Sequence, residues 1–528
     1  MIKNILLIDV ECDRTTNSRS QLQTRWSHHP IGLMYIATAV EKAFKDIKFE
    51  ILHTVTCLNA EDSVESLLVN FQPDLVGLRS LNIFQDRFHK IARLIRDKAP
   101  NTLLIGGGPY PSSSYKKILE DKIVDLAVLG EGEKTFVELV AWLRDHDHLP
   151  DDLSGTAVLK NGKSKLNAAR SIIENLDELP IPNYNLINLS DYKGISNLAF
   201  QEADKSAFME ASRGCTYKCY YCHAALSKTV RRRAPHLVLE ELEIHYSKRG
   251  IRDFVFVDDI FNVPKDVAKE ILRLIIQRFP GVRLNFSNGL RADQLDDEIL
   301  DLLEEAGTVH IALAVETATP RLQKLIVKNL RLKKAKEMIH KASQRFIVCT
   351  FFMVGFPTET MEEAKETVNF ARDLTYLAQP VLNIVRVYPG TPIFDALDPT
   401  PEQAQLIDEQ ASANPTIKAT DNPNFYGDFF PRNKVPMVGK DITAIRLQWM
   451  RHVLLNKERI RNSYNVMRKF FNEDQIIHFN KNFFDNPDFK KQELTKLLGQ
   501  AGNMNTGSSK SLSHTSPTGP LLKITPFN

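Results

Sequence analysis

The chain of 528 residues lacks three features that would each assign it to a class. It has no apolar run approaching the ~18 uninterrupted residues that a membrane span requires. Its 68 Lys and Arg almost balance its 65 Asp and Glu, for a net charge of +3, which argues against a dedicated binder of nucleic acid or another polyanion. Six cysteines are too few for a disulfide scaffold. We therefore expect a cytoplasmic protein of about three domains, at ~150 residues each.

The first 145 residues alternate strand and helix patterns. Continuous apolar runs occur at 5–10, 75–78, 103–105 and 125–129, and the segments between them have helical periodicity. The opening MIKNILLIDV meets Asp9 too early for a signal peptide and indicates a buried strand. Apolar strands that alternate with helices predict a doubly wound parallel sheet with helices on both faces.

Glycines follow two of these predicted strands. Gly106, Gly107 and Gly108 come after LLI, and Gly130 and Gly132 lie in LGEGE. Ligands of open parallel sheets bind at the carboxyl ends of the strands, where glycines let the backbone approach a bulky cofactor. The alternative is that these glycines only form tight turns.

The rest of the chain divides into four segments. Residues 146–205 look like a linker with a hairpin around Asn161 and Gly162. Residues 206–395 contain six strand and helix pairs, which predict a partial (β/α)6 barrel with its active site at the carboxyl ends of the strands. Residues 396–500 predict a mainly helical region with one long basic helix at 441–471, and the polar tail 501–528 is expected to be disordered.

Three cysteines fall within eight positions as C-x3-C-x2-C: Cys215, Cys219 and Cys222. The other three are scattered and are expected to be ordinary small residues. Closely spaced thiolates are typical of iron–sulfur clusters, whereas structural zinc needs four ligands, and His223 is poorly placed beside Cys222 as a fourth. The spacing favours an iron–sulfur cluster and leaves zinc as the alternative.

This motif, with an aromatic residue before its last cysteine and a position after the first barrel strand, resembles that of the radical S-adenosylmethionine enzymes. The resemblance implies that the three cysteines hold a [4Fe-4S] cluster whose fourth iron binds the amino and carboxylate groups of S-adenosylmethionine. An electron donor such as flavodoxin or ferredoxin would then drive cleavage of the cofactor to a 5'-deoxyadenosyl radical.

The resemblance extends to the residues expected around S-adenosylmethionine. It places Tyr221 beside the adenine, Asp258 and Asp259 of VFVDDIF near the methionine amino group, and Glu316 of AVETAT at the ribose. The matching segments also imply contacts from Thr317 and Gly355. Read alone, the two aspartates could form an exposed turn and Glu316 a buried ion pair.

The first 145 residues resemble the cobalamin-binding domain that precedes many radical S-adenosylmethionine cores. The motif D-x-H-x-x-G, whose histidine ligates cobalt in methionine-synthase-like domains, is absent. The resemblance therefore implies a corrin with no histidine on cobalt, and His28 and His29 are expected to be solvated loop residues. The segments PDLVGLRS, LLIGGGPYP and LGEGE carry the implied cobalamin-binding residues Gly77, Ser80, Gly107, Gly108, Gly130, Glu131 and Gly132.

Together the resemblances imply a class B radical S-adenosylmethionine methyltransferase that acts on a small-molecule or natural-product substrate. The radical would remove a hydrogen atom from an unactivated carbon, and methylcobalamin would deliver a methyl group to it. Two alternatives stay open at this point. One is a cobalamin-linked radical rearrangement or cyclisation, and the other is a cofactor-binding sensor without catalytic activity.

Overall fold

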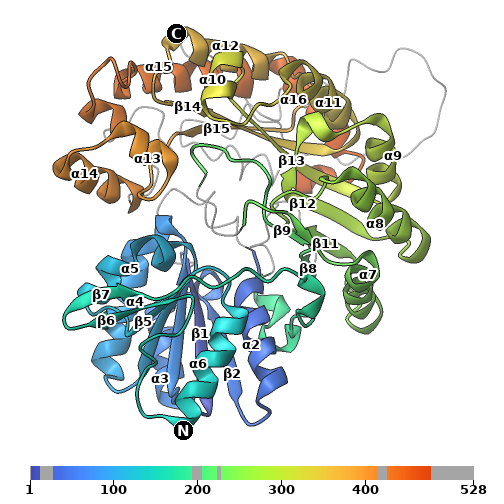
Figure 1. The fold of residues 1–528 in the computed structure, drawn as a ribbon. Coiled ribbons are helices and arrows are strands. Elements are labelled where there is room, and N and C mark those ends of the chain that lie inside the picture. The colour runs from blue at the N-terminus through green and yellow to red at the C-terminus, as the bar shows by residue number, and fades with distance from the viewer. Residues whose placement is uncertain (1, 12–27, 193–204, 223–226, 413–424, 477–528) are drawn as a thin grey trace. The chain divides into compact units, whose positions relative to one another are not determined.

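The structure is a computed structural model that describes residues 2–11, 28–192, 205–222, 227–412 and 425–476 (Figure 1). The chain forms two compact units. Unit 1 comprises Met1–Asn197, Ala203–Val263 and Arg386–Pro415, and unit 2 comprises Leu198–Glu202, Pro264–Val385 and Thr416–Asn528. Among the helices of the described ranges, none is long and apolar enough to cross a membrane.

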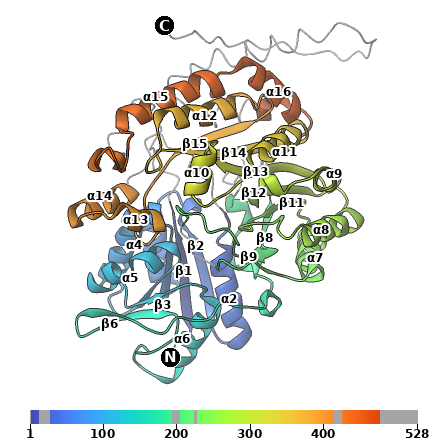
Figure 2. The same cartoon turned by 45° about the horizontal axis from the view of Figure 1, so that its top comes forward.

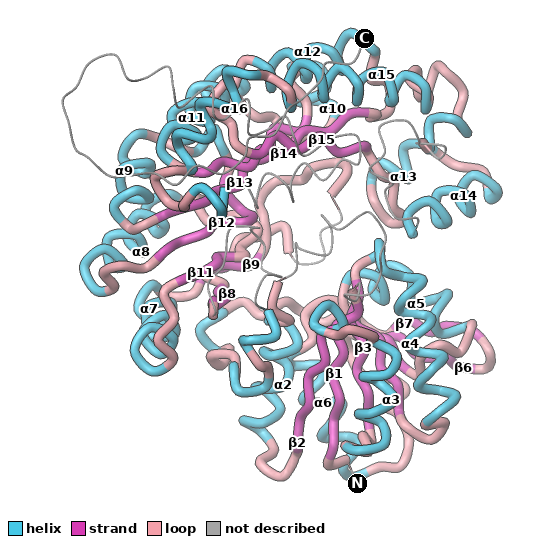
Figure 3. The backbone as a smooth tube through the Cα atoms, turned by 180° about the vertical axis from the view of Figure 1, so that it is seen from behind, coloured by secondary structure: helices cyan, strands magenta, loops and turns pink. Residues whose placement is uncertain are grey.

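Unit 1 begins with a seven-stranded sheet in the order β2-β1-β3-β4-β5-β6-β7 (Figure 3). The strands β1 to β5 pair in parallel, and β6 and β7 continue the sheet in antiparallel pairing. The strands are β1 (Asn4–Val10), β2 (Lys48–His53), β3 (Leu75–Ser80), β4 (Leu103–Gly107), β5 (Leu126–Val128), β6 (Thr156–Lys160) and β7 (Lys163–Leu166).

Helices cover both faces of this sheet because successive strand residues point to opposite sides. In β1, Leu6 and Ile8 join one core with residues of α3, α4 and α5, while Ile5 and Leu7 join a second core with α2 and α6. This arrangement confirms the predicted doubly wound sheet. The helices are α2 (Ile31–Ala43), α3 (Ala60–Asn70), α4 (Gln85–Lys98), α5 (Pro109–Glu120) and α6 (Glu133–Asp145).

The predicted hairpin at Asn161 and Gly162 is present and joins β6 to β7. Both residues have positive φ, 52° and 77°, as a two-residue turn between antiparallel strands requires. The hairpin pairs with β5 and extends the edge of the sheet, so this part of the segment 146–205 packs on the sheet that precedes it.

The second part of unit 1 starts a new series of parallel strands. The strands β8 (Ser206–Met209) and β11 (Asp253–Phe256) pair in parallel. Between them lie the two-residue strands β9 (Ser212–Arg213) and β10 (Arg231–Arg232), which pair antiparallel. The helices of this part are α7 (Pro235–Glu243), α13 (Pro392–Leu397) and α14 (Pro401–Ser412).

Unit 2 contains four further parallel strands, which bring the number of parallel strands in the series to the predicted six. Helices α11, α12 and α16 lie along these strands in Figure 2. The strands are β12 (Arg283–Leu290), β13 (Thr308–Glu316), β14 (Ile347–Val354) and β15 (Gln379–Ile384). The helices are α8 (Lys265–Arg278), α9 (Asp297–Glu305), α10 (Pro320–Leu325), α11 (Leu332–Arg345), α12 (Met361–Arg372), α15 (Gly439–Trp449) and α16 (Lys457–Met467).

The C-terminal region is helical as predicted, but the single helix expected at 441–471 is wrong. The chain forms α15, a π-helical turn at Met450–Leu454, and then α16. Asn456 starts α16, because its side chain accepts a hydrogen bond from the backbone N–H of Arg459 (3.1 Å). The predicted disordered tail 501–528 lies outside the described residues.

Candidate functional site

The three cysteines lie on one loop of unit 1, between the paired strands β9 and β10. Gly214 starts the loop with φ +87°, and a Cβ atom there would lie 2.3 Å from the carbonyl oxygen of Thr229. Only glycine fits this position. The backbone N–H of Cys215 donates to the carbonyl oxygen of Ser227 (3.0 Å), and that of Cys222 donates to the carbonyl oxygen of Cys219 (3.1 Å). These bonds fold the segment as the turn that the sequence predicts.

The three thiols are free and form no disulfide. Two thiolates on one zinc ion lie no more than about 4.6 Å apart, twice the Zn–S bond. In the described part of the chain, only Asp9, Glu11 and His53 form a group of three or more ligand side chains within 4.8 Å of one another. The sulfurs of Cys215, Cys219 and Cys222 do not form such a group in the described residues.

Asp258 and Asp259, which follow β11, hold the segment that leads to Cys215. The carboxylate of Asp258 accepts hydrogen bonds from the Ser212 hydroxyl (2.5 Å) and the backbone N–H of Ala211 (3.3 Å). The carboxylate of Asp259 accepts one from the backbone N–H of Gly214 (3.0 Å). Burial raises the pKa of Asp258 to about 6. Both aspartates thus hold the segment before Cys215; Asp258 is buried, whereas Asp259 is exposed at a bend, as the alternative interpretation expects.

The other side of the cysteine loop is attached to the start of α13. The backbone N–H of Ile393 donates to the carbonyl oxygen of Tyr220 (3.2 Å), the neighbour of Tyr221. The Thr391 hydroxyl donates to the carbonyl oxygen of Tyr388 (2.6 Å) and shapes this turn. The segment YPGTPIF, which resembles the end of the barrel in related sequences, therefore helps to hold the cysteine loop.

In unit 2, Glu316 ends β13 in a constrained conformation. Its φ is +67°, which is rare for a residue other than glycine. The Gln323 side chain donates to the carbonyl oxygens of Val315 (2.8 Å) and Thr317 (2.6 Å), one on each side of Glu316. The carboxylate itself is buried and lies 3.2 Å from the ammonium nitrogen of Lys328. Strain that the surroundings maintain in this way is typical of functional sites.

Gly355, after β14, also occupies a position that requires glycine. Its φ is +92°, and a Cβ atom would lie 2.7 Å from the ring of Phe425. Its backbone N–H donates to the carboxylate of Glu359 (2.6 Å), and its carbonyl oxygen accepts from the Tyr426 hydroxyl (2.7 Å). Burial raises the pKa of Glu359 to about 8. Gln323 and Lys328 belong to no motif that the sequence revealed, whereas Glu359 lies in FMVGFPTET with Gly355.

The predicted cobalamin residues of unit 1 lie at the carboxyl ends of the neighbouring strands β3, β4 and β5, apart from Gly77 within β3. A Cβ atom at Gly77 would lie 2.7 Å from the Leu7 side chain, and one at Gly132 would lie 2.8 Å from Ile36. These two glycines serve packing. In contrast, a Cβ atom at Gly107 or Gly130 would meet no atom of the described residues within 4 Å. The sheet edge is thus open at these two positions.

The remaining predicted residues at this edge contact protein groups. Gly108 has φ +85°, and a Cβ atom there would lie 2.8 Å from Arg79. The Ser80 hydroxyl donates to the carbonyl oxygen of Leu81 (3.0 Å). The carboxylate of Glu131 lies 2.9 Å from the guanidinium of Arg231.

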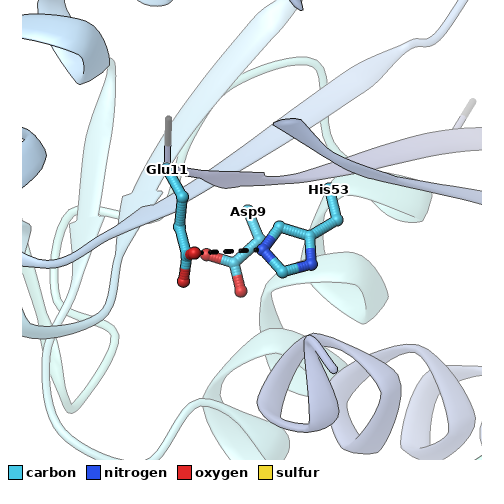
Figure 4. Close-up of side chains that lie close together, drawn as sticks. All are labelled: Asp9, Glu11 and His53. Carbon is cyan, nitrogen blue, oxygen red and sulfur yellow. Dashed lines mark ion pairs between the residues drawn. The ribbon is translucent and has the colours of Figure 1, made fainter. Parts of the chain in front are cut away.

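A charged group that the sequence did not reveal lies at the carboxyl ends of β1 and β2. Figure 4 shows the carboxylates of Asp9 and Glu11 close to the imidazole of His53. The distance from Glu11 to His53 is 3.6 Å, and the guanidinium of Arg79 lies 2.8 Å from Asp9. His53 also shares a hydrogen bond with the Tyr192 hydroxyl (3.1 Å). Arg79 supplies the positive charge that balances these carboxylates.

The two histidines expected to be solvated are not exposed. His29 is buried, and its ring lies 4.4 Å from that of Tyr192 and 4.3 Å from that of Phe208 between ring centroids. Burial lowers the pKa of His29 well below its usual value and that of His28 to about 4. The expectation of solvated loop residues is therefore wrong, because linker residues such as Tyr192 cover this end of the sheet.

Comparisons with known proteins agree with this architecture. Residues 209–371 match the Radical SAM superfamily, and residues 24–140 match the B12 binding domain. The chain is 28% identical over 379 residues to an uncharacterised methyltransferase of Pyrococcus horikoshii, covering 69% of this chain and 78% of the relative. It is 24% identical over 320 residues to the anaerobic magnesium-protoporphyrin IX monomethyl ester cyclase of Rubrivivax gelatinosus, covering 60% and 57%.

A solved structure shows the same fold. The cobalamin-dependent S-adenosylmethionine radical enzyme OxsB, solved with aqua-cobalamin bound, superposes with a TM-score of 0.63 at 15% identity. The match covers 91% of this chain and 72% of that one. This likeness confirms the predicted order of a parallel-sheet domain, a partial barrel and a helical C-terminal region.

Proposed function

Because the chain is a radical S-adenosylmethionine enzyme with a B12-binding domain, we propose that it transfers a methyl group to an unactivated carbon of a small-molecule substrate. One observation carries the proposal: a loop of three free thiols occurs in the same unit as a parallel sheet with an open glycine edge in the described residues. When bound, the cluster with S-adenosylmethionine supplies a radical that removes a hydrogen atom from the substrate, and cobalamin supplies the methyl group.

The residues of the cysteine loop have distinct roles in this proposal. Cys215, Cys219 and Cys222 hold the cluster and leave one of its irons free for S-adenosylmethionine. Asp258 and Asp259 fix the backbone just before Cys215 through their hydrogen bonds to it. Tyr221 lies within the loop and would cover the adenine, and the family motifs assign Glu316, Thr317 and Gly355 to S-adenosylmethionine as well.

At the sheet edge, Gly107 and Gly130 leave the space that a corrin or its tail requires. Backbone groups can approach a flat cofactor closely only where side chains are absent. Ser80 and Gly108 lie on the neighbouring segments and would contact the same cofactor. Gly77 and Gly132 would act indirectly, by letting β3 and α6 pack closely.

A cobalamin-linked cyclisation is the second candidate function. It is favoured by the similarity to the cyclase of Rubrivivax gelatinosus. Both candidates consume S-adenosylmethionine to form 5'-deoxyadenosine and methionine. Only a methyltransferase that draws its methyl group from S-adenosylmethionine also leaves S-adenosylhomocysteine.

The test is to reconstitute the protein with iron, sulfide and cobalamin, and to incubate it with S-adenosylmethionine and a reductant. We expect both 5'-deoxyadenosine and S-adenosylhomocysteine, the latter only when cobalamin is bound. Formation of 5'-deoxyadenosine alone would favour cyclisation or rearrangement. Formation of neither product by a protein that contains the cluster would favour a sensor.

We also propose an electron donor such as flavodoxin or ferredoxin as the partner and the cytoplasm as the location. Cys222 is the exposed member of the three cysteines, while Cys215 and Cys219 are half-buried. An electron would therefore reach the cluster most directly on the side of Cys222. A reducing compartment keeps such thiols available for a cluster.

Replacing Glu316 with glutamine is expected to weaken binding of S-adenosylmethionine by about 1–3 kcal/mol, the usual cost of losing a charged hydrogen bond. The carboxylate would accept hydrogen bonds from the ribose, and its strained backbone fixes its direction. Equilibrium binding of S-adenosylmethionine to the reconstituted protein measures the effect.

The control is Lys328→Met, which removes the ion pair and keeps the carboxylate. Both variants are expected to lose stability, because each removes one charge of a buried ion pair. If Lys328→Met weakens binding of S-adenosylmethionine as much as Glu316→Gln does, loss of the ion pair alone explains the weaker binding. The proposed contact of Glu316 with the ribose is then wrong.

A further inference from the structure

We propose that Glu131, Glu133, Arg213 and Arg231 form a positioning network that fixes the cysteine loop against the loop assigned above to cobalamin. The inference rests on the proposed function, since it concerns the relative placement of its two metal cofactors. All four residues belong to unit 1. None of them is expected to touch a reacting atom.

Both arginines lie at the base of the cysteine loop. Arg213 and Arg231 are directly paired in the antiparallel register of β9 and β10, so they close the loop that carries Cys215, Cys219 and Cys222. Arg213 lies two positions before the first of these cysteines. Any shift of the two arginines therefore moves the ends of the loop.

Both glutamates lie where β5 passes into α6, in the segment LGEGE. Glu131 accepts from Arg231 Nη1 with both carboxylate oxygens (2.9 Å each) and lies 3.3 Å from Arg213 Nη1. Glu133 lies 2.7 Å from Arg213 Nη1. The backbone N–H of Ile173 also donates to Glu131 (2.7 Å). The network thus joins two segments that are about a hundred positions apart in the sequence.

The glycines around Glu131 fix the direction of its side chain. Gly130 has φ +76°, and a Cβ atom at Gly132 would lie 2.8 Å from Ile36. The positive φ favours glycine at position 130. The carboxylate of Glu131 lies against the arginines, so the turn that carries Gly130 is joined to the base of the cysteine loop.

The four side chains are almost fully buried, with exposed fractions of 3–6%. A buried ion pair contributes little net stability compared with apolar residues of the same volume, because removing two charges from water is costly. It does fix one arrangement of the groups that it joins, since any other leaves a buried charge unpaired. The network is therefore better explained as a device that fixes the position of the two loops than as a source of folding stability.

The chain offers a matched control in the ion pair between Arg233 and Glu241. It is equally buried, with exposed fractions of 4% and 0%, and Arg233 directly follows β10. This pair joins the exit of the hairpin to α7, and within the described ranges the Arg233 side chain donates to Glu241 and to the carbonyl oxygens of Glu210 and Leu237, not to LGEGE. Glu241→Gln should therefore lower stability without affecting the link between the two loops.

The first experiment uses the full chain without cofactors and measures amide hydrogen exchange in Glu131→Gln, Arg231→Met and Glu241→Gln. Glu131→Gln keeps an oxygen for Ile173, and Arg231→Met keeps much of the apolar stem. We expect exchange at least about tenfold faster in both 129–132 and 211–214 for the first two variants, because removing one partner of a buried pair is strongly destabilising locally. Glu241→Gln should leave 129–132 unchanged.

The second experiment measures the distance between cobalt(II) and the reduced cluster by pulsed electron paramagnetic resonance in the loaded protein. We expect a narrow distribution in the wild type and in Glu241→Gln, and a broader one in Glu131→Gln and Arg231→Met. Arg231→Lys, which keeps the charge, should restore a narrower distribution. If the network only stabilised the fold, all variants with equal cofactor content would give the same distribution of cobalt–cluster distances.

The proposal would be overturned by either of two results. One is unchanged exchange of 129–132 in both network variants. The other is a distribution as narrow as that of the wild type in variants that contain both cofactors. If the wild type retains no cobalamin, the proposed function fails, and the exchange experiment still decides whether the network couples the loops.

Discussion

Replacing Cys215, Cys219 and Cys222 together with alanine is expected to abolish both iron–sulfur absorbance and cleavage of S-adenosylmethionine. No other described group of the chain brings three cysteines onto one loop. The hydrogen bonds of Asp258 and Asp259 to residues 211–214 do not involve the thiols, so the fold around the loop should persist. Iron and sulfide per chain, measured with 5'-deoxyadenosine formation, test the prediction.

The control for this variant is Cys349→Ala. Cys349 lies in β14 with a fully buried thiol, and burial raises its pKa far above the usual value. Removing its sulfur should cost about 1 kcal/mol of stability through lost packing and leave the iron content unchanged. A reconstituted wild-type protein that contains zinc and no iron would contradict the assignment of the three cysteines.

A strand of the first sheet could be predicted from the sequence when both of its faces are covered, but not when it lies at the edge of the sheet. The buried strands β1, β3, β4 and β5 appear in the sequence as continuous apolar runs, because both of their faces are covered. The edge strand β2, KFEILH, mixes exposed and buried residues, so it forms no continuous apolar run and was not predicted. The break between α15 and α16 was not predicted either, because the charged residues around Asn456 continue a helical sequence pattern across it.

The cysteine loop could be predicted because its chemistry is local. The spacing of the cysteines and Gly214 before them lie within nine residues. The groups that support the site are distant in sequence or belong to no motif. Arg231 meets Glu131 across a hundred positions, and the contact of Lys328 with Glu316 depends on how the chain turns after β13. Such contacts follow from tertiary packing, which no local pattern records.

Replacing Gly107 with valine is expected to reduce cobalamin binding roughly five- to hundredfold, the equivalent of about 1–3 kcal/mol for forcing extra bulk into an occupied space. Gly107 is the last residue of β4, and within the described part of the chain no atom lies within 4 Å of its Cβ position. Valine is favoured in strands, so the substitution should leave the fold intact. If a cofactor occupies that space, the added methyl groups would clash with it and weaken its binding.

This reasoning separates Gly107 from its neighbour. Gly108→Val should also lose cobalamin, but its positive φ and its approach to Arg79 would distort the sheet edge itself. Gly281→Val supplies the control. A Cβ atom there also meets no described atom within 4 Å, but φ is +75°, so valine should strain the backbone and lower stability. This variant therefore tests whether lost stability alone releases the corrin. Cobalamin per chain, measured by absorbance, should fall in Gly107→Val and stay at the wild-type level in Gly281→Val, with the cluster retained in both. Full cobalamin content in a folded Gly107→Val protein would place the corrin away from this edge, because a bound macrocycle there leaves no room for the side chain.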